Sequence, residues 1–253
     1  MLKRYAFYFL ALSVLCWCVS PAASAAESGA NDAVVTVIQG TARVYTKGST
    51  AGRVLKKGDV LKKENEVKVA EKSRMEIRFP DGTVMRLSEK SQLKMNELSF
   101  NKQTDEKNVK VNLSVGRLWA NVRKLMTPGS SVEVRTSNAV AGVRGTVYRV
   151  NVADDKSALV RVYDGSVYVA NPPRDASQPN DTASAPHEVS GPREVPPPYH
   201  EVSLEEWTVI VKAMQQISIT SQGVPSKPEN FDPQADADDW VKWNQERDKE
   251  TSL

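Results

Sequence analysis

The chain is poor in the residues that carry most enzyme chemistry. Its 253 residues include two cysteines, Cys16 and Cys18, and two histidines, His187 and His200. Both cysteines lie in an apolar N-terminal segment, so a chain that loses this segment can form neither disulfides nor thiolate sites. Both histidines lie in a proline-rich stretch, which would have to hold them rigidly to build a metal site or a Ser-His-Asp triad. The sequence therefore predicts a protein that is not an enzyme and that binds no metal and no cofactor.

The chain also lacks a strong excess of one charge. Removing Lys3 and Arg4 with the N-terminal segment lowers the count of Lys and Arg from 34 to 32, against 31 acids. This balance argues against a nucleic-acid partner, which would need clustered cations. The charges are nevertheless unevenly spread, because residues 47–110 hold sixteen Lys and Arg against ten acids and residues 181–253 hold six against fourteen. A basic body and an acidic tail can attract each other, or both can be solvated surfaces.

Only one long apolar run is present, and it lies at the start of the chain. Residues 5–19 follow the basic Met1-Leu-Lys-Arg4 and precede Ala23-Ser-Ala25, which is the pattern of a secretory signal peptide cleaved after Ala25. The run is short for a membrane span, so cleavage is favoured over an uncleaved inner-membrane anchor. We therefore expect residues 1–25 to be removed and the mature protein to be periplasmic.

Helical periodicity is scarce before residue 201, whereas strand alternation is common. Met75, Ile77 and Phe79 alternate with charged residues, and Pro80-Asp-Gly82 then turns the chain back to form a hairpin. Alternation recurs in residues 109–115 and 147–169, the latter with an Asp-Gly turn. The pattern predicts a mainly β domain in residues 26–170, built of stacked β-hairpins that form a two-sheet sandwich or a solenoid-like domain.

The composition changes after this domain. Residues 171–200 are rich in Pro, Ser, Asn and Asp, which predicts an extended linker. Residues 201–253 predict a short α-helical C-terminal extension. Its first helix is expected at residues 203–217, where Ser203 and Glu206 form a capping box and an apolar stripe reaches from Leu204 to Ile217. A second helix is expected around Trp240 and Trp243.

The first of these helices would be marginal alone, so its stripe must dock on another surface. That surface is either the β domain of the same chain or a partner. The chain's own domain is favoured, because its cationic surface matches the acidic tail and because a permanently exposed apolar stripe invites aggregation.

Arg144 is the sharpest candidate for a binding residue. It stands between Gly142 and Gly145, where the missing side chains expose backbone N–H groups. An arginine in this setting can bind a carboxylate or an anionic ligand, or it can fasten a loop by bonding backbone carbonyls. Tryptophans of the C-terminal extension are candidate partner-binding anchors, and strand aromatics can either stack on sugars or pack in the sheets. The former are Trp207, Trp240 and Trp243, and the latter are Trp119, Tyr148, Tyr163 and Tyr168.

Several short motifs occur in the order found in one known family. They are Lys57-Gly-Asp59, Phe79-Pro-Asp-Gly-Thr83, Gly116-Arg-Leu-Trp119, Ala139-Val-Ala-Gly-Val-Arg-Gly-Thr146 and Val162-Tyr-Asp-Gly-Ser-Val-Tyr-Val169. In this order they resemble the FecR domain over residues 34–170, and residues 243–248 resemble a C-terminal extension of some secreted FecR-type proteins. The resemblance implies a non-enzymatic periplasmic protein that binds another envelope protein, either as a sensor or as a structural adaptor.

The resemblance does not carry over every function of the family. In the resembled regulators a cytoplasmic segment controls a sigma factor, but only four residues precede the apolar run here, so direct sigma-factor contact is not expected. The alternative function is binding of a glycan or peptidoglycan. It is implied by the wall-binding modules associated with the family and by the strand aromatics.

Overall fold

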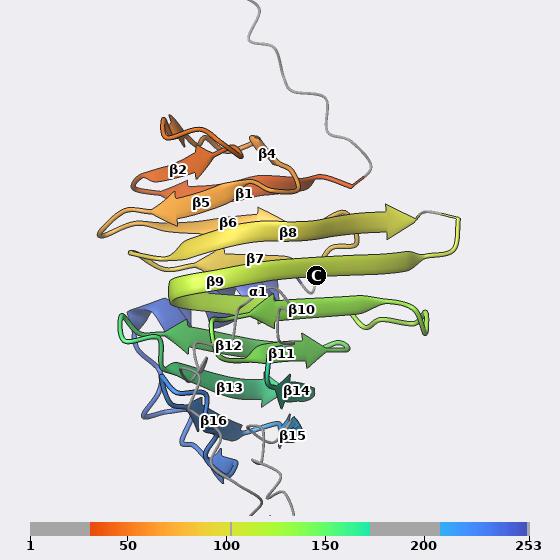
Figure 1. Cartoon of the computed structure of the whole chain (residues 1–253), viewed down its shortest axis with the longest axis vertical. Helices are drawn as coiled ribbons and strands as arrows, with labels where there is room; N and C mark the ends of the chain where they lie inside the picture. The colour runs from red at the N-terminus through yellow and green to blue at the C-terminus, as the bar shows by residue number, and fades with distance from the viewer. Residues whose placement is uncertain (1–30, 102, 173–207, 252–253) are drawn as a thin grey trace, which may run out of the picture.

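The structure is a computed structural model, and it describes residues 31–101, 103–172 and 208–251. Two β-sheets face each other, and their strands are stacked along the long axis of the molecule (Figure 1). Sheet A has the order β4-β1-β6-β7-β9-β12-β13-β16-β17, and sheet B has the order β3-β2-β5-β8-β9-β10-β11-β14-β15. The predicted mainly β, two-sheet architecture is confirmed. Within the described ranges, no helix combines the length and the apolar character needed to cross a membrane.

The elements have the following bounds: β1 Ala33–Gln39, β2 Ala42–Tyr45, β3 Arg53–Val54, β4 Val60–Leu61, β5 Glu66–Val69, β6 Arg74–Arg78, β7 Val84–Leu87, β8 Gln92–Asn101, β9 Glu106–Asn121, β10 Ser131–Arg135, β11 Val140–Val143, β12 Val147–Val152, β13 Ala158–Asp164, β14 Ser166–Ala170, β15 Thr208–Lys212, β16 Gln215–Ile219, β17 Glu229–Asn230 and α1 Asp239–Thr251.

Strand β9 belongs to both sheets and joins them at the centre of the stack. Residues up to Val115 pair with β8 and β10 in sheet B, and residues from Gly116 onward pair with β7 and β12 in sheet A. Gly116 has a φ of 99°, and a Cβ built on it would lie 2.4 Å from the Cα of Ser91. Glycine is required at this crossing, because a side chain would meet both an unfavourable φ and a neighbouring backbone.

The other crossings between the sheets use the same backbone device. Except in the loop of residues 122–130, the chain passes from one sheet to the other through a residue with positive φ, which turns the strand direction sharply. These corner residues are Gly40, Gly58, Glu64, Lys72, Lys90, Gly116, Gly145, Gly165 and Met214. Because the chain changes sheet at these corners, its strands form two facing sheets, a sandwich, rather than one flat sheet.

The core lies between the two sheets and is almost entirely apolar. Met75, Ile77 and Phe79 are buried in it, which confirms the predicted inward face of β6. Tyr148 is also fully buried, and its hydroxyl has no hydrogen-bond partner in the structure. Burial raises the pKa of this hydroxyl, because the apolar core disfavours the phenolate.

The predicted helix at residues 203–217 is wrong over its described part. Residues 208–212 and 215–219 form β15 and β16, which pair with β14 and β13 and so extend both sheets beyond residue 170. The chain turns at Met214, whose φ is 63° and whose N–H donates to the Val162 carbonyl at an N···O distance of 2.7 Å. The run Val209-Ile-Val211 is β-branched, and the open edges of β13 and β14 supply backbone partners that an isolated segment lacks. The capping box, at residues 203–206, lies outside the described residues.

The second predicted helix is confirmed as α1. Asp238 caps it, because its Oδ1 accepts the N–H of Val241 at 2.8 Å. The helix lies against the sheets near the level of β9 (Figure 1), on the outer face of sheet A, where its residues bond to side chains of β7 and β9.

Candidate functional site: the arginine face of sheet A

A continuous row of polar and aromatic side chains crosses the outer face of sheet A. Strand pairing places Glu76 beside Arg86, Arg86 beside Trp119, Trp119 beside Arg149, and Arg149 beside Arg161. Outward positions of a sheet normally meet solvent. Here four members of the row are buried, because the C-terminal segment covers them. We call this segment, residues 231–251, the tail, and we call the covered surface, formed by Arg86, Arg117, Trp119, Arg149, Arg161 and Tyr163, the arginine face.

One end of the row forms a buried ion network with the last turns of α1. Arg86 Nε lies 2.7 Å from Glu76 Oε2, and Arg86 Nη1 lies 2.6 Å from Asp248 Oδ1. The second oxygen of Asp248 accepts the indole N–H of Trp119 at 2.9 Å. Arg247 returns from the helix to Glu76, with its Nε 2.8 Å from Oε2. An acid of the helix thus pairs with an arginine of the sheet, and an arginine of the helix pairs with an acid of the sheet.

The other end of the row is organised around Asp236, which lies just before the helix. Its carboxylate accepts a hydrogen bond from Arg149 Nη2 at 2.5 Å, and it also accepts hydrogen bonds from Arg161 and from the Tyr163 hydroxyl. Burial, followed by this bond to Asp236, raises the pKa of the Tyr163 hydroxyl. One buried carboxylate thus joins three side chains from β12 and β13.

Aromatic rings fill the space between these two ends. The Trp119 ring lies 4.5 Å from Tyr163 and 6.3 Å from Trp240, which it meets edge-on. The guanidinium of Arg117 lies 4.6 Å from the centre of the Trp240 ring, and Arg74 lies at the same distance from the Trp243 ring. Cations placed over indole rings at this distance are attracted by the ring quadrupole.

The carboxylates of the site are held in their charged form. Burial raises the pKa of Glu76, but hydrogen bonds from Arg247, Thr36 and Arg86 outweigh it and lower the pKa to about 2. Burial likewise opposes the charge of Asp238, while the Val241 N–H and Arg117 lower its pKa below the ordinary value. Neither acid can serve as a proton donor near neutral pH.

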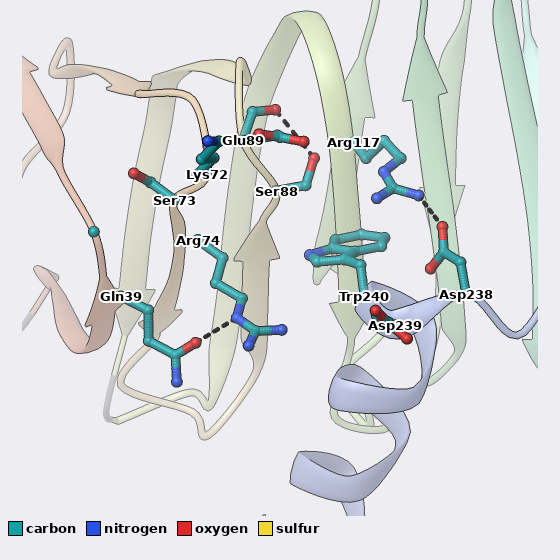
Figure 2. A pocket seen from close by; sticks show the side chains of 11 residues that line it. Gln39, Lys72, Ser73, Arg74, Ser88, Glu89, Arg117, Asp238, Asp239 and Trp240 are labelled. Atoms are coloured by element: carbon teal, nitrogen blue, oxygen red, sulfur yellow. Dashed lines mark hydrogen bonds and ion pairs between the residues drawn. The ribbon is translucent and has the colours of Figure 1, made fainter.

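An open pocket of about 480 Å³ lies between the first turn of α1 and the corners of sheet A. Figure 2 shows Arg74 and Arg117 reaching toward it from the two sides, with the ring of Trp240 beneath Arg117. The lining pairs the cations Lys72, Arg74 and Arg117 with the acids Glu89, Asp238 and Asp239. The two serines in the lining, Ser73 and Ser88, donate hydrogen bonds to the backbone carbonyls of Glu71 and Glu89. In the described part of the chain no group of His, Cys, Asp and Glu could hold a metal ion.

Comparison with known proteins agrees with the sequence motifs. Residues 65–168 match the model of the FecR protein family. Residues 65–168 therefore correspond to a FecR domain. Strands β1–β4 precede the matched range and β15–β17 follow it, so the sandwich is larger than the match.

No curated protein matches the chain. Two crystal structures of a candidate anti-sigma factor from Parabacteroides distasonis ATCC 8503 are similar to it, each with 19% identity and a TM-score of 0.44. Each match covers 67% of this chain and 61% of the other, so the chain spans about three-fifths of the length of those proteins.

The glycine-bracketed arginine lies apart from the tail within the FecR domain. Arg144 is exposed and its Nη2 donates to the Pro128 carbonyl at 2.9 Å, as expected of an arginine that fastens a loop. Gly145 is a corner residue with a φ of 79°, and a Cβ on it would lie 2.8 Å from the Cα of Lys124. Gly142 lies within β11, and a Cβ on it would lie 4.0 Å from the carbonyl oxygen of Tyr168, an ordinary van der Waals contact.

Two of the three predicted tryptophan anchors lie in the tail. Trp240 and Trp243 both lie in α1, and Trp240 packs against Trp119 of the FecR domain while Trp243 is partly buried beside it. Trp207 lies outside the described residues. Two of the three anchors thus contact the chain's own sheet.

Sequence reasoning missed the charged members of the row. Glu76, Arg86 and Arg149 lie at outward strand positions, where side chains normally meet solvent. The residue types did hint at this site. Arginines and a tryptophan stand at outward positions of several strands, and the acids that pair with them lie in the tail. What the sequence does not show is the strand register that brings them into one row.

Proposed function

We propose that this FecR-domain chain is a non-enzymatic protein of the cell envelope that acts by binding another envelope protein, as a sensor or a structural adaptor. The observation that carries the proposal is the arginine face together with the acids that neutralise it. Guanidinium groups do not exchange protons near neutral pH, but they bind carboxylates with strong, directed hydrogen bonds. Such a surface is suited to recognition of a polypeptide rather than to acid-base catalysis.

The proposed location is the periplasm, reached through the N-terminal segment. The support is the basic start, the apolar run and the Ala-x-Ala site. The intact mass of the exported protein should correspond to a chain that begins at Ala26, recovered from the periplasmic fraction. Full-length protein in the membrane fraction would instead identify the segment as an anchor.

Glycan binding is the second candidate, and one residue favours it. Tyr168 is 49% exposed on the outer face of sheet B, beside the similarly exposed Ile210 on β15. An exposed ring on a flat sheet can stack on a sugar. Trp119, Tyr148 and Tyr163 are not available in the same way, because core or tail covers them. A single ring is a poor platform for a polymer, so a protein partner is the better supported proposal.

A capture experiment separates the two functions. The mature full chain, fixed to a support, should retain an envelope protein that remains bound after the extract is treated with glycosidases. Tyr168→Ala should retain it equally well, because the proposed contact does not involve this ring. Binding that disappears with glycosidase and with Tyr168→Ala would replace the proposal with glycan recognition.

A further inference from the structure

The arginine face has the composition of a binding site for an acidic peptide, and the chain's own tail occupies it. We propose that the partner protein binds this same face through an acidic, aromatic segment that displaces the tail. This inference rests on the proposed function and adds to it the surface and the chemistry of the partner. The tail is then a resident competitor that limits binding to segments of matching chemistry.

The charges of the face require an acidic occupant. Four arginines lie on it, and within the sheet row the only carboxylate beside them is Glu76. The remaining neutralising groups come from the tail, where Asp248 bonds to Arg86, Asp238 to Arg117, and Asp236 to both Arg149 and Arg161. Without the tail these cations would repel one another and attract any acidic segment that reaches them.

The geometry favours a polypeptide over a lipid surface. Asp248 uses one oxygen for Arg86 and the other for the Trp119 indole N–H, and Trp240 places its ring edge-on against Trp119. These contacts need carboxylates and aromatic rings held at fixed spacing, as on a helix. An anionic membrane would supply charge without that spacing.

The docked tail fits the face imperfectly. Four buried polar atoms at this interface have no hydrogen-bond partner in the structure: Arg86 Nη2, Arg149 Nε, Trp240 Nε1 and Asn244 Oδ1. Buried polar atoms without partners weaken an interface, and replacing water around buried charges is itself costly. A segment that satisfied these atoms would bind the face better than the tail does. The tail is therefore suited to being exchanged.

The tail stays on the arginine face although its fit is imperfect, because it is covalently attached close to that face. The tail follows β17, which pairs with β16 in the same sheet, so it is held close to the face. A tethered segment acts at an effective concentration on the order of millimolar. A free peptide of equal intrinsic affinity cannot compete at micromolar concentration, and the site opens only when the tail is weakened or the partner segment is superior.

The test uses the full mature chain and a labelled peptide with the sequence of residues 232–251. In the double variant Asp236→Asn and Asp248→Asn the tail loses its main charged contacts, while every residue of the arginine face is unchanged. By fluorescence anisotropy the peptide should bind this variant at least about tenfold more tightly than it binds the wild type. A control peptide with Asn at positions 236, 238 and 248 should bind the variant at least about tenfold more weakly than the acidic peptide.

A second measurement distinguishes a variant that fails to fold from a proposal that is wrong. Hydrogen exchange of the variant reports separately whether the tail amides are exposed and whether the sheet amides stay protected. If the tail is exposed and the sheet intact, yet the acidic peptide binds no better than the control peptide, the inference is wrong. It is also wrong if vesicles containing anionic lipid bind the variant and displace the peptide. The proposed function is judged apart from this, because an envelope protein captured equally by wild type and double variant would keep that function and move its surface elsewhere.

Discussion

Glu76, which lies beside the arginine face on sheet A, is a charged residue at an outward sheet position that is nevertheless buried. Glu76 is fully buried and bonds to Thr36, Arg86 and Arg247, so it connects β1, β7 and the tail. Removing one partner of a buried ion pair is costly, because the remaining charge stays away from water. The free energy of folding should therefore respond to Glu76 far more than to any surface carboxylate.

The substitution Glu76→Gln tests this through pH. The pKa of Glu76 is lowered from 4.5 to about 2, so the stabilisation is fully present above about pH 4.5 and is lost as the pH falls toward 2. By urea denaturation at pH 7 the variant should be less stable by roughly 3–5 kcal/mol. Between pH 4.5 and 2 it should lack the part of the wild-type decline that this carboxylate causes. The control is Glu97→Gln, whose pair with Lys110 is partly exposed, and which should change stability by less than about 1 kcal/mol. Equal losses in the two variants would contradict the network.

Phe79 tests the assignment of strand faces in the sandwich. Its ring is buried between the sheets, 6.4 Å from that of Phe100. Phe79→Ala should lower the free energy of unfolding by about 3–5 kcal/mol, because a large cavity replaces the ring. Tyr168→Ala removes a half-exposed ring and should cost less than about 1 kcal/mol. Chemical denaturation measures both, and a loss near zero for Phe79→Ala would show that this ring does not belong to the core.

At the scale of elements, β9 holds the two sheets in one body. It runs 16 residues through both, and the change of sheet occurs at Gly116. Gly116→Ala should destabilise the protein by roughly 2–4 kcal/mol, because it combines an unfavourable φ with a clash against Ser91. Gly142→Ala is the matched control, since its φ is not positive and the nearest atom to a new Cβ is 4.0 Å away. Thermal unfolding should separate the two variants clearly, and similar melting temperatures would argue against the crossing.

Strand alternation made the central hairpins predictable, but it did not decide the structure of the segment after residue 200. Leu204, Trp207, Val211 and Met214 have helical spacing, while Val209-Ile-Val211 is also a β-branched run. The backbone partners of β15 and β16 are about forty to sixty residues away in sequence, so local pattern alone could not reveal them. The arginine face was hidden for the same reason, since Arg86, Trp119 and Arg149 become neighbours only through strand register. The uneven charge was visible in the sequence, but of the arginines that pair with acids of the tail only Arg86 lies in the basic stretch of residues 47–110, while Arg117, Arg149 and Arg161 follow it.

The two outer faces of the whole molecule differ. The tail covers the middle of sheet A with acids and aromatic rings, whereas the outer face of sheet B carries charged residues of both signs and the exposed pair of Tyr168 and Ile210. The tail contributes the apolar side chains of Phe231, Trp240, Val241 and Trp243 to its contact. Charge complementarity should therefore act together with these apolar contacts in keeping the tail docked.

Hydrogen exchange of the full chain tests this account most directly. In the wild type the amides of α1 after its first turn should exchange slowly, as in a helix docked on the sandwich. In the double variant Asp236→Asn and Asp248→Asn the same amides should exchange much faster, while those of β6, β7, β9 and β12 keep their protection. If the amides of α1 are already unprotected in the wild type, or if they stay equally protected in the variant, the tail is not held on the arginine face by its acids.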